Sequence, residues 1–341
     1  MGWKEHPYAL AAGGAVSLLD QTDHGCPAFS VAAQVLEQNR SFIARHKLGG
    51  PEFEIWLLPS SLKANARAFD LGAVGAVFIH GGLLTRIWDA LARVVAGSFF
   101  LASRFAWKQP GPDADVPGGT WVVANDKRSA YFLEAFGRAV EFVIFHEIAH
   151  LRRRHVRRYR DASGHDFIDE AFGMASEAVV GSKLLQLLEF DADATALEMC
   201  LNATSWFRAE RGEGSSALEP DHLTSELFLR LLAGPVTFLA LDLEAEQSAV
   251  SYLGQHPPSI HRAMRYTLLL GDTIRSLTPE ADIEPFVDQA WTELGFLARR
   301  LGVDGGRWHH RRDELHAFEK LDRIADEANA FSLAIDREMS S

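Results

Sequence analysis

Residues 146–150 read His-Glu-Ile-Ala-His, and this pentapeptide constrains the fold more than any other part of the 341-residue chain. It lies inside residues 130–158, where apolar side chains recur at the spacing of an α-helix. Positions four apart lie just over one helical turn from each other, so His146 and His150 share a face and can hold one metal ion. Glu147 lies beside them, placed to take a proton from a zinc-activated water. The alternative is a solvated or core helix face that carries two histidines by chance.

The next long helical pattern, residues 174–206, is expected to supply a third ligand. Glu189 and Asp193 are four apart in this pattern and share a face. Two histidines and one carboxylate would leave the fourth position of a zinc ion open, as a catalytic site requires. Asp193 would then orient a ligand histidine through its free ring N–H. Asp191 is the competing acid, but it points about 200° round the helix from Glu189. An acidic helix surface without a metal is the alternative.

Helical patterns dominate the sequence, and strand patterns are confined to its first third. The strand patterns are residues 53–58 and 75–79, with a third short strand at 120–123. The helical patterns are residues 28–47, 83–105, 130–158, 174–206, 223–245, 257–270, 282–301 and 311–338. The sequence therefore predicts an α+β, mostly helical fold with a small N-terminal sheet and a helical C-terminal region.

The expected organisation centres on one catalytic unit, because the candidate site residues must converge. We expect an N-terminal helical segment at residues 1–52, a catalytic domain at 53–270 and a C-terminal helical extension at 271–341. The catalytic domain would carry an insertion at about 85–138. This insertion contains the Pro/Gly-rich segment 109–119, which is the strongest loop signal in the chain.

Composition disfavours several classes of protein. The formal net charge of −12 argues against a general binder of nucleic acids or anionic membranes, since both attract cationic surfaces. No stretch of about 20 uncharged apolar residues is present, so we expect no membrane span. Only two cysteines occur, which favours a reducing compartment and a soluble, cytoplasmic protein. The oligomeric state stays open. The arginine-rich run at residues 152–160 favours a solvated helix face, with a docking site for an acidic substrate or nucleic acid as the alternative.

Three further stretches join the His-Glu-Ile-Ala-His motif in a recognisable order. Asn65-Ala66 precedes residues 76–84, the motif itself continues to His155, and Gln-His-Pro-Pro-Ser-Ile-His-Arg occupies residues 255–262. In this order they resemble the gluzincin-type zinc metallopeptidases of the HtpX and CAAX prenyl protease family. The phage-exclusion (Lit-like) peptidases are a second resemblance, and one sequence does not separate the two. Because this chain lacks the spanning helices of the membrane-embedded members, membrane and prenylated substrates are not carried over.

The resemblance implies a zincin-like core and further site residues. His256 would help stabilise the oxyanion, and Arg262 would support it or contact the substrate. Ala76, Val77 and Phe78 would belong to an edge strand that borders the active site. Such an edge could bind an extended peptide by strand addition; alternatively, the strand pairs inside the sheet.

Together these residues favour a zinc-dependent endopeptidase acting on protein or peptide substrates. His146, His150 and Glu189 would hold one zinc ion, and Glu147 would act as the general base. The alternative is a metal-stabilised interaction or regulatory module whose peptidase site is unused or latent. Glu147 argues against this alternative, because a purely structural metal site has no need of a general base. The sequence does not specify the substrate.

Overall fold

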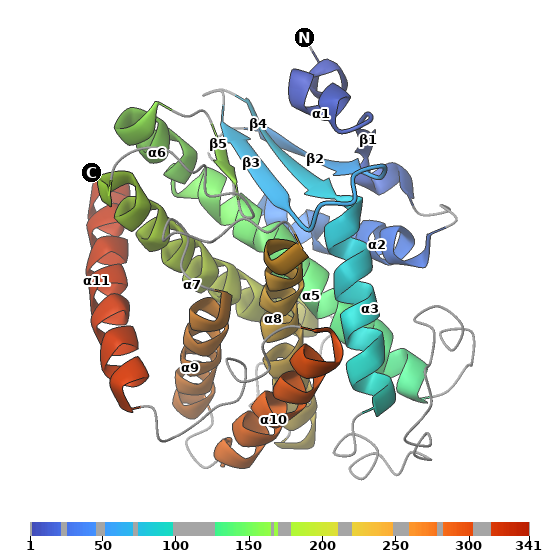
Figure 1. Cartoon of the computed structure of the whole chain (residues 1–341), viewed down its shortest axis with the longest axis vertical. Coiled ribbons are helices and arrows are strands. Elements are labelled where there is room, and N and C mark those ends of the chain that lie inside the picture. Colours follow the sequence, from blue (N-terminus) through green and yellow to red (C-terminus); the bar gives the residue numbers. More distant parts are fainter. Residues whose placement is uncertain are drawn as a thin grey trace.

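The structure is a computed structural model, and it describes eleven stretches of the chain. These are residues 2–21, 26–45, 52–70, 74–97, 127–164, 167–169, 179–210, 220–247, 259–277, 282–302 and 315–340. Within them the fold is α+β and mostly helical, with one small sheet at one end of a set of long helices (Figure 1). None of the described helices combines the length and the apolar character needed to cross a membrane.

Most of the described residues are helical. The α-helices are α1 (Pro7–Ala11), α2 (Pro27–Arg45), α3 (Gly81–Gly97), α5 (Lys127–Arg152), α6 (His155–Ser163), α7 (Val179–Glu210), α8 (Pro220–Gln247), α9 (Ser259–Leu277), α10 (Glu284–Arg300) and α11 (Leu315–Ser340). Of two short 3-10 helices, η1 (Trp3–Glu5) precedes α1 and η2 (Leu18–Gln21) follows the N-terminal strand.

The described strands form one sheet in the order β1-β2-β4-β3-β5. Their bounds are β1 (Val16–Ser17), β2 (Glu52–Leu58), β3 (Ala66–Asp70), β4 (Val74–His80) and β5 (Phe167–Asp169). Strands β2 and β4 are parallel, whereas β3 is antiparallel to both of its neighbours. The expectation that β4 is an edge strand is therefore wrong, because β2 and β3 occupy both of its edges.

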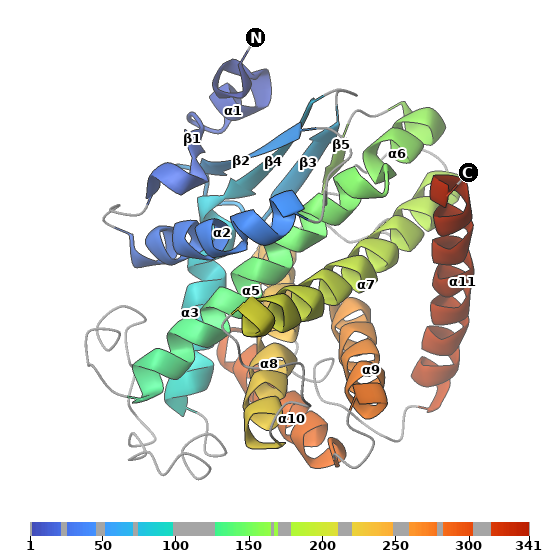
Figure 2. The same cartoon turned by 180° about the vertical axis from the view of Figure 1, so that it is seen from behind.

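The two faces of the sheet are covered by different parts of the chain. Alternate side chains of a strand point to opposite faces, and Val77 and Ile79 of β4 join the large core that the helices build. Phe78 of the same strand joins a smaller cluster with Phe69 and the N-terminal segment. Figure 2 shows α2 and α5 on one side of the sheet and α1 on the other. The sheet thus separates the helical core from the N-terminal segment.

Helix α5 lies close beneath the sheet because a glycine in β4 permits it. A Cβ atom on Gly75 would lie 3.1 Å from Leu151 Cδ1, near the end of α5. The start of α3 is held by a similar close approach, since a Cβ atom on Gly82 would lie 2.2 Å from the backbone of Leu62. Helix α5 also packs against α7 and α8. The helix that carries the His-Glu-Ile-Ala-His motif is therefore enclosed between the sheet and the other long helices.

The sequence patterns locate most elements within a few residues, with two informative differences. Strand β3 is not predicted by pattern, because Ala-Arg-Ala-Phe-Asp lacks β-branched residues. The helical pattern at 130–158 is divided into α5 and α6. The break lies at Arg154, which has a left-handed φ of 56°, and a helix cannot continue through such a residue without strain.

The region expected as an insertion, residues 85–138, includes most of α3 and the start of α5. Trp88 of α3 meets Phe132 and Phe136 of α5 edge to face, with ring centroids 4.6 and 4.9 Å apart. These described parts therefore belong to the core. The Pro/Gly-rich loop at 109–119 and the expected strand at 120–123 lie outside the described residues. The division at residues 52 and 270 stays a prediction.

Candidate metal centre

His146, His150 and Glu189 come together although α5 and α7 are well separated in sequence. His146 and His150 lie one turn apart near the end of α5, and Glu189 faces them from α7. All three side chains are buried, and each offers one ligand atom within 4.8 Å of the other two. The three residues that the sequence predicted as ligands therefore lie close together in space. A cluster of this kind could hold a metal ion.

The distances between the donor atoms fit a single ion. His146 Nε2 lies 2.9 Å from His150 Nε2 and 3.4 Å from Glu189 Oε2. His150 Nε2 lies 3.6 Å from Glu189 Oε1. A tetrahedral zinc ion with bonds of about 2.0–2.1 Å separates its ligand atoms by about 3.3 Å. The observed spacings surround that value, and two imidazoles with one carboxylate are a donor set typical of catalytic zinc.

Asp193 contacts His146 from outside the donor cluster, whereas Arg262 also contacts the donor atoms, with its Nη2 3.4 Å from His146 Nε2. Asp193 Oδ1 lies 3.0 Å from His146 Nδ1, the ring nitrogen that points away from the donor cluster. Arg262, near the start of α9, contacts Asp193 through Nη2 at 2.7 Å and Glu189 Oε2 through Nη1 at 3.1 Å. Burial alone would raise the pKa of Asp193, but Arg262 and the hydrogen bond with His146 outweigh it and lower that pKa. Arg262 therefore joins two acids of α7 to α9.

Glu147 lies in a buried position, with a cation and a phenol within electrostatic range. The side chain is 1% exposed, and Arg67 of β3 and Tyr8 of α1 both interact with its charge. The Arg67 guanidinium lies 4.2 Å from the centroid of the Tyr8 ring. Burial raises the pKa of Tyr8 to about 12, with Arg67 opposing the shift. Neither Arg67 nor Tyr8 is singled out by the sequence, because no motif connects them with α5.

A second group of buried polar residues lies behind His150. His155 Nδ1 lies 3.1 Å from His150 Nδ1, and His155 Nε2 lies 2.8 Å from Asp191 Oδ2. Arg153 donates from Nε to the same Asp191 oxygen. Burial raises the pKa of Asp191, but the hydrogen bond from His155 and the charges of His155 and Arg153 lower it to about 2. Asp191 does point away from the donor cluster, as the helix geometry predicts, yet it is not a surface acid.

Comparison with known proteins agrees with this arrangement. Residues 96–268 match the family described as Peptidase U49, and this span is just over half of the chain. The chain belongs to the Peptidase U49 family. The matched span includes α5 and α7, which carry the His-His-Glu cluster, and the first part of α9 with Arg262. No curated protein and no solved structure matched the chain.

Family membership supports a peptidase that acts on protein substrates. Of the two resemblances suggested by the sequence, the Lit-like one is supported, because the U49 family is a family of Lit-like peptidases. The features specific to the HtpX and CAAX prenyl proteases are not confirmed. A zincin-like core stays a prediction, since no solved structure supports it.

The structure does not bring every predicted site residue to the metal centre. His256 lies outside the described residues. Ala76, Val77 and Phe78 are fully buried in β4, which is paired along both edges, so a peptide cannot add to this strand. Their predicted role as an accessible edge is wrong for this reason, and the alternative of pairing inside the sheet is confirmed.

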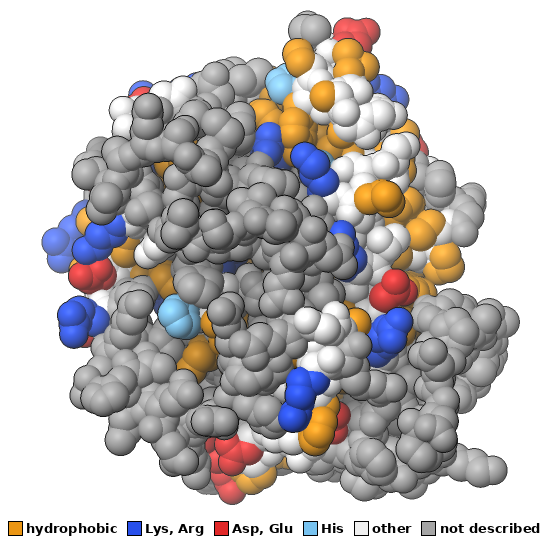
Figure 3. All heavy atoms as spheres, viewed as in Figure 1, with side chains coloured by type: hydrophobic (Ala, Val, Ile, Leu, Met, Phe, Trp, Pro, Cys, Tyr) orange, Lys and Arg blue, Asp and Glu red, His pale blue; other side chains and the backbone are white. Residues whose placement is uncertain are grey.

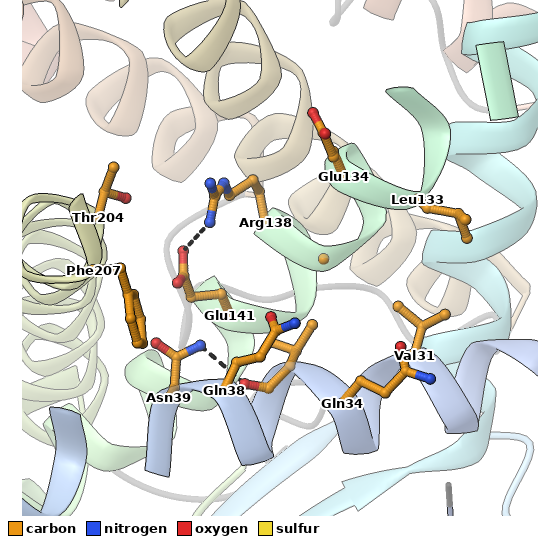
Figure 4. Close-up of a pocket in the computed structure, with 12 residues that line it drawn as sticks. Val31, Gln34, Gln38, Asn39, Leu133, Glu134, Arg138, Glu141, Thr204 and Phe207 are labelled. Carbon is orange, nitrogen blue, oxygen red and sulfur yellow. Dashed lines mark hydrogen bonds and ion pairs between the residues drawn. The ribbon is translucent and has the colours of Figure 1, made fainter. Parts of the chain in front are cut away.

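A cavity of about 500 Å³ lies elsewhere, between α2, α5 and α7. Figure 4 shows Arg138 and Glu141 of α5 on one side of it and Asn39 of α2 on another. Glu141 is paired with Arg138 at 3.7 Å and with the buried Arg230 of α8 at 3.0 Å. None of the three metal-cluster residues lines this cavity, so we assign no part of the peptidase reaction to it.

On the face of the molecule seen in Figure 1, the described residues form no large patch of one charge. Lys and Arg side chains appear in small groups there, interspersed with acidic and apolar ones (Figure 3). The arginine-rich run after α5 is divided, because Arg153 is buried whereas Arg152 and Arg157 are exposed. The interpretation of this run as one solvated face is therefore wrong for Arg153, which points into the core.

Proposed function

We propose that this chain is a zinc-dependent endopeptidase with one zinc ion held by His146, His150 and Glu189. The observation that supports it is the buried cluster of these three donors beside Glu147, in a chain of a peptidase family. Zinc is the proposed ion because two histidines and one carboxylate are its usual catalytic donors. When bound, zinc would polarise the scissile carbonyl and lower the pKa of a water to about 7.

The protein's own side chains would then carry the proton and hold the ligands. Glu147 accepts a proton from the attacking water and passes it to the leaving amine as the peptide bond breaks. Asp193 Oδ1 lies 3.0 Å from His146 Nδ1 and would hold the proton on that nitrogen, so that Nε2 faces the ion. Arg262 holds Glu189 and Asp193 in place by contacting both carboxylates. His256 is proposed as the oxyanion donor on the resemblance alone.

The cysteines are the basis for proposing a cytoplasmic location. Cys26 and Cys200 are both free thiols, and Cys200 is buried. Burial raises the pKa of the Cys200 thiol, which keeps it protonated and unreactive. A domain of this size without any disulfide is typical of a reducing compartment.

The test compares the unmodified protein with Glu147→Gln. We expect about one zinc per chain in both proteins, measured by elemental analysis, because Glu147 is not a ligand. We expect cleavage to fall at least about 100-fold in the variant, since a positioned general base contributes about 10²–10⁴ in rate. Cleavage would be followed by labelling new N-termini in a proteome exposed to each protein, which also identifies the substrates.

Two outcomes would contradict the proposal. Purified protein that contains no zinc and takes up none would remove the metal centre. Glu147→Gln cleaving as fast as the unmodified protein would remove the general base. A biological activity that survives Glu147→Gln unchanged would favour a metal-stabilised regulatory module instead.

A further inference from the structure

A chain of hydrogen bonds leads from His150 to the C-terminal helix. His150 Nδ1 meets His155 Nδ1 at 3.1 Å, and His155 Nε2 meets Asp191 Oδ2 at 2.8 Å. Arg153 contacts Asp191 through Nε and reaches Asp336 of α11 through Nη1 at 2.7 Å. The first three members of this chain are at most 1% exposed.

The direction of each hydrogen bond follows from what each atom can donate. For His150 to hold a metal through Nε2, its proton must be on Nδ1, and Nδ1 then donates. A carboxylate only accepts, so His155 Nε2 must donate to Asp191. His155 Nδ1 is then left with its lone pair, which is the acceptor that His150 requires. The chain is therefore consistent with one set of proton positions, in which His150 Nε2 is free to bind the metal.

The backbone break after α5 is what makes this contact possible. In a continuous helix His155 would stand five residues beyond His150, about 140° round the axis. The left-handed Arg154 ends α5 instead and turns the chain, so that His155 begins α6 and faces inward. The same turn buries Arg153, whose neighbours Arg152 and Arg154 stay exposed.

Helix α11 contacts this region through two neighbouring ion pairs that differ in one respect. Asp336 pairs with Arg153, which also donates from Nη2 to Ser332 O and Oγ at 3.1 Å. Glu338 pairs with Arg158 of α6 at 2.5 Å, and within the described residues no hydrogen bond joins Arg158 to Asp191 or His155. The two acids thus secure the same helix to the same region, and only Asp336 is connected to the chain behind His150.

We propose that His155 and Asp191 are positioning residues for the metal ligand His150, and that Arg153 links this support to α11. This inference rests on the proposed zinc site. Partners of this kind fix the ring orientation and the tautomer of a metal-binding histidine, and their loss costs about 10–100-fold in metal affinity. The metal centre then has two supports: Asp193 for His146, and the pair His155–Asp191 for His150.

The first experiment measures zinc affinity by competition with a chromophoric chelator. His155→Leu removes the acceptor next to His150, and we expect the zinc Kd to rise about 10–100-fold. His155→Asn keeps an oxygen acceptor at the place of Nδ1, so it should recover part of this loss. Co²⁺-loaded protein gives a second readout, because a reoriented His150 should alter the visible absorption bands of the ion in His155→Leu. A folded His155→Leu protein with unchanged zinc Kd and unchanged Co²⁺ bands would overturn the role of His155.

The second experiment uses Asp336→Asn with Glu338→Gln as its matched control. Both variants remove one ion pair between α11 and the region after α5, so general loosening of α11 affects them alike. We expect zinc Kd to rise at least about twofold in Asp336→Asn, less than for a direct partner of His150, and to stay unchanged in Glu338→Gln. Equal zinc Kd in both variants would overturn the link to α11, whichever way it moved.

The outcomes separate this inference from the proposed function. Unmodified protein that binds no zinc would overturn both. If the unmodified protein binds zinc and Glu147→Gln abolishes cleavage, but the His155 and Asp336 variants keep the original zinc Kd, only the support for His150 is refuted.

Discussion

At the scale of single residues, the buried His80 is held through both of its ring nitrogens. His80, at the end of β4, is 1% exposed and has Tyr8 Oη 2.5 Å from Nε2 and Ser61 Oγ 2.6 Å from Nδ1. Burial, together with the nearby charges of Arg67 and Lys63, lowers the pKa of His80 to about 3. His80 therefore stays neutral in the folded protein far below pH 6.5.

This burial predicts a loss of stability in acid. Below pH 6.5 the unfolded chain protonates His80, whereas the folded protein does not until about pH 3. The unfolded state then binds more protons, so the free energy of unfolding falls as pH falls. The contribution is about 2 kcal/mol between pH 6.5 and pH 4.5. Urea unfolding across this range should show a shallower decline for His80→Gln than for the unmodified protein. Parallel curves for the two would refute the assignment to His80.

At the scale of elements, the N-terminal segment acts as a cover for the outer face of the sheet. Trp3 lies with its ring centroid 6.0 Å from that of Phe78 and 6.4 Å from that of Phe69. Leu10 of α1 belongs to the same segment but is 60% exposed. The ring contacts of Trp3 stabilise the fold, because they remove aromatic surface from water.

We therefore expect unequal effects from two substitutions in this segment. Trp3→Ala should lower the free energy of unfolding by about 2 kcal/mol, since it uncovers Phe69 and Phe78. Leu10→Ala should change it by no more than about 0.5 kcal/mol, as for most exposed positions. Urea unfolding of both variants tests this, and equal effects would mean that the segment does not stabilise the sheet through Trp3.

At the scale of the whole molecule, the candidate metal centre is where remote parts of the chain meet. His146 and His150 come from α5, Glu189 from α7 and Arg262 from α9. Arg262 contacts both acids, Glu189 and Asp193, and its Nη2 lies 3.4 Å from His146 Nε2. A bound ion would join α5 to α7 through its three ligands and so stabilise the packing of these two helices, as well as serving the reaction.

Removal of the metal should lower the thermal stability of the entire chain. A ligand at 100 times its Kd stabilises the folded state by about 2.7 kcal/mol, which corresponds to about 4 °C in Tm for a protein of this size. We expect calorimetry to show this loss after chelation and its recovery with added zinc. His150→Asn, which lacks one ligand, is the control and should respond much less. An unchanged Tm in protein shown to have lost its zinc would contradict the coupling.

Sequence spacing predicted those pairs of site residues that lie on one face of the same helix. His146 and His150 share a face of α5, and Glu189 and Asp193 share a face of α7, because helical geometry repeats every 3.6 residues. Strands β2 and β4 were likewise predictable, since runs of apolar and β-branched residues favour strands. These features depend on neighbours within about four residues, which a sequence shows directly.

Tertiary structure alone decided what these elements contact. Pairing with β2 and β3 placed β4 inside the sheet, and pairing with β4 and β5 made a strand of Ala66–Asp70. The turn at Arg154 placed His155 against His150, and the packing of α5 on α7 placed Asp191 behind both. Such contacts join residues far apart in the chain, and their energy depends on burial and on partners that local spacing does not encode. The sequence determined which residues could bind a metal, and the tertiary fold decided which residues support them.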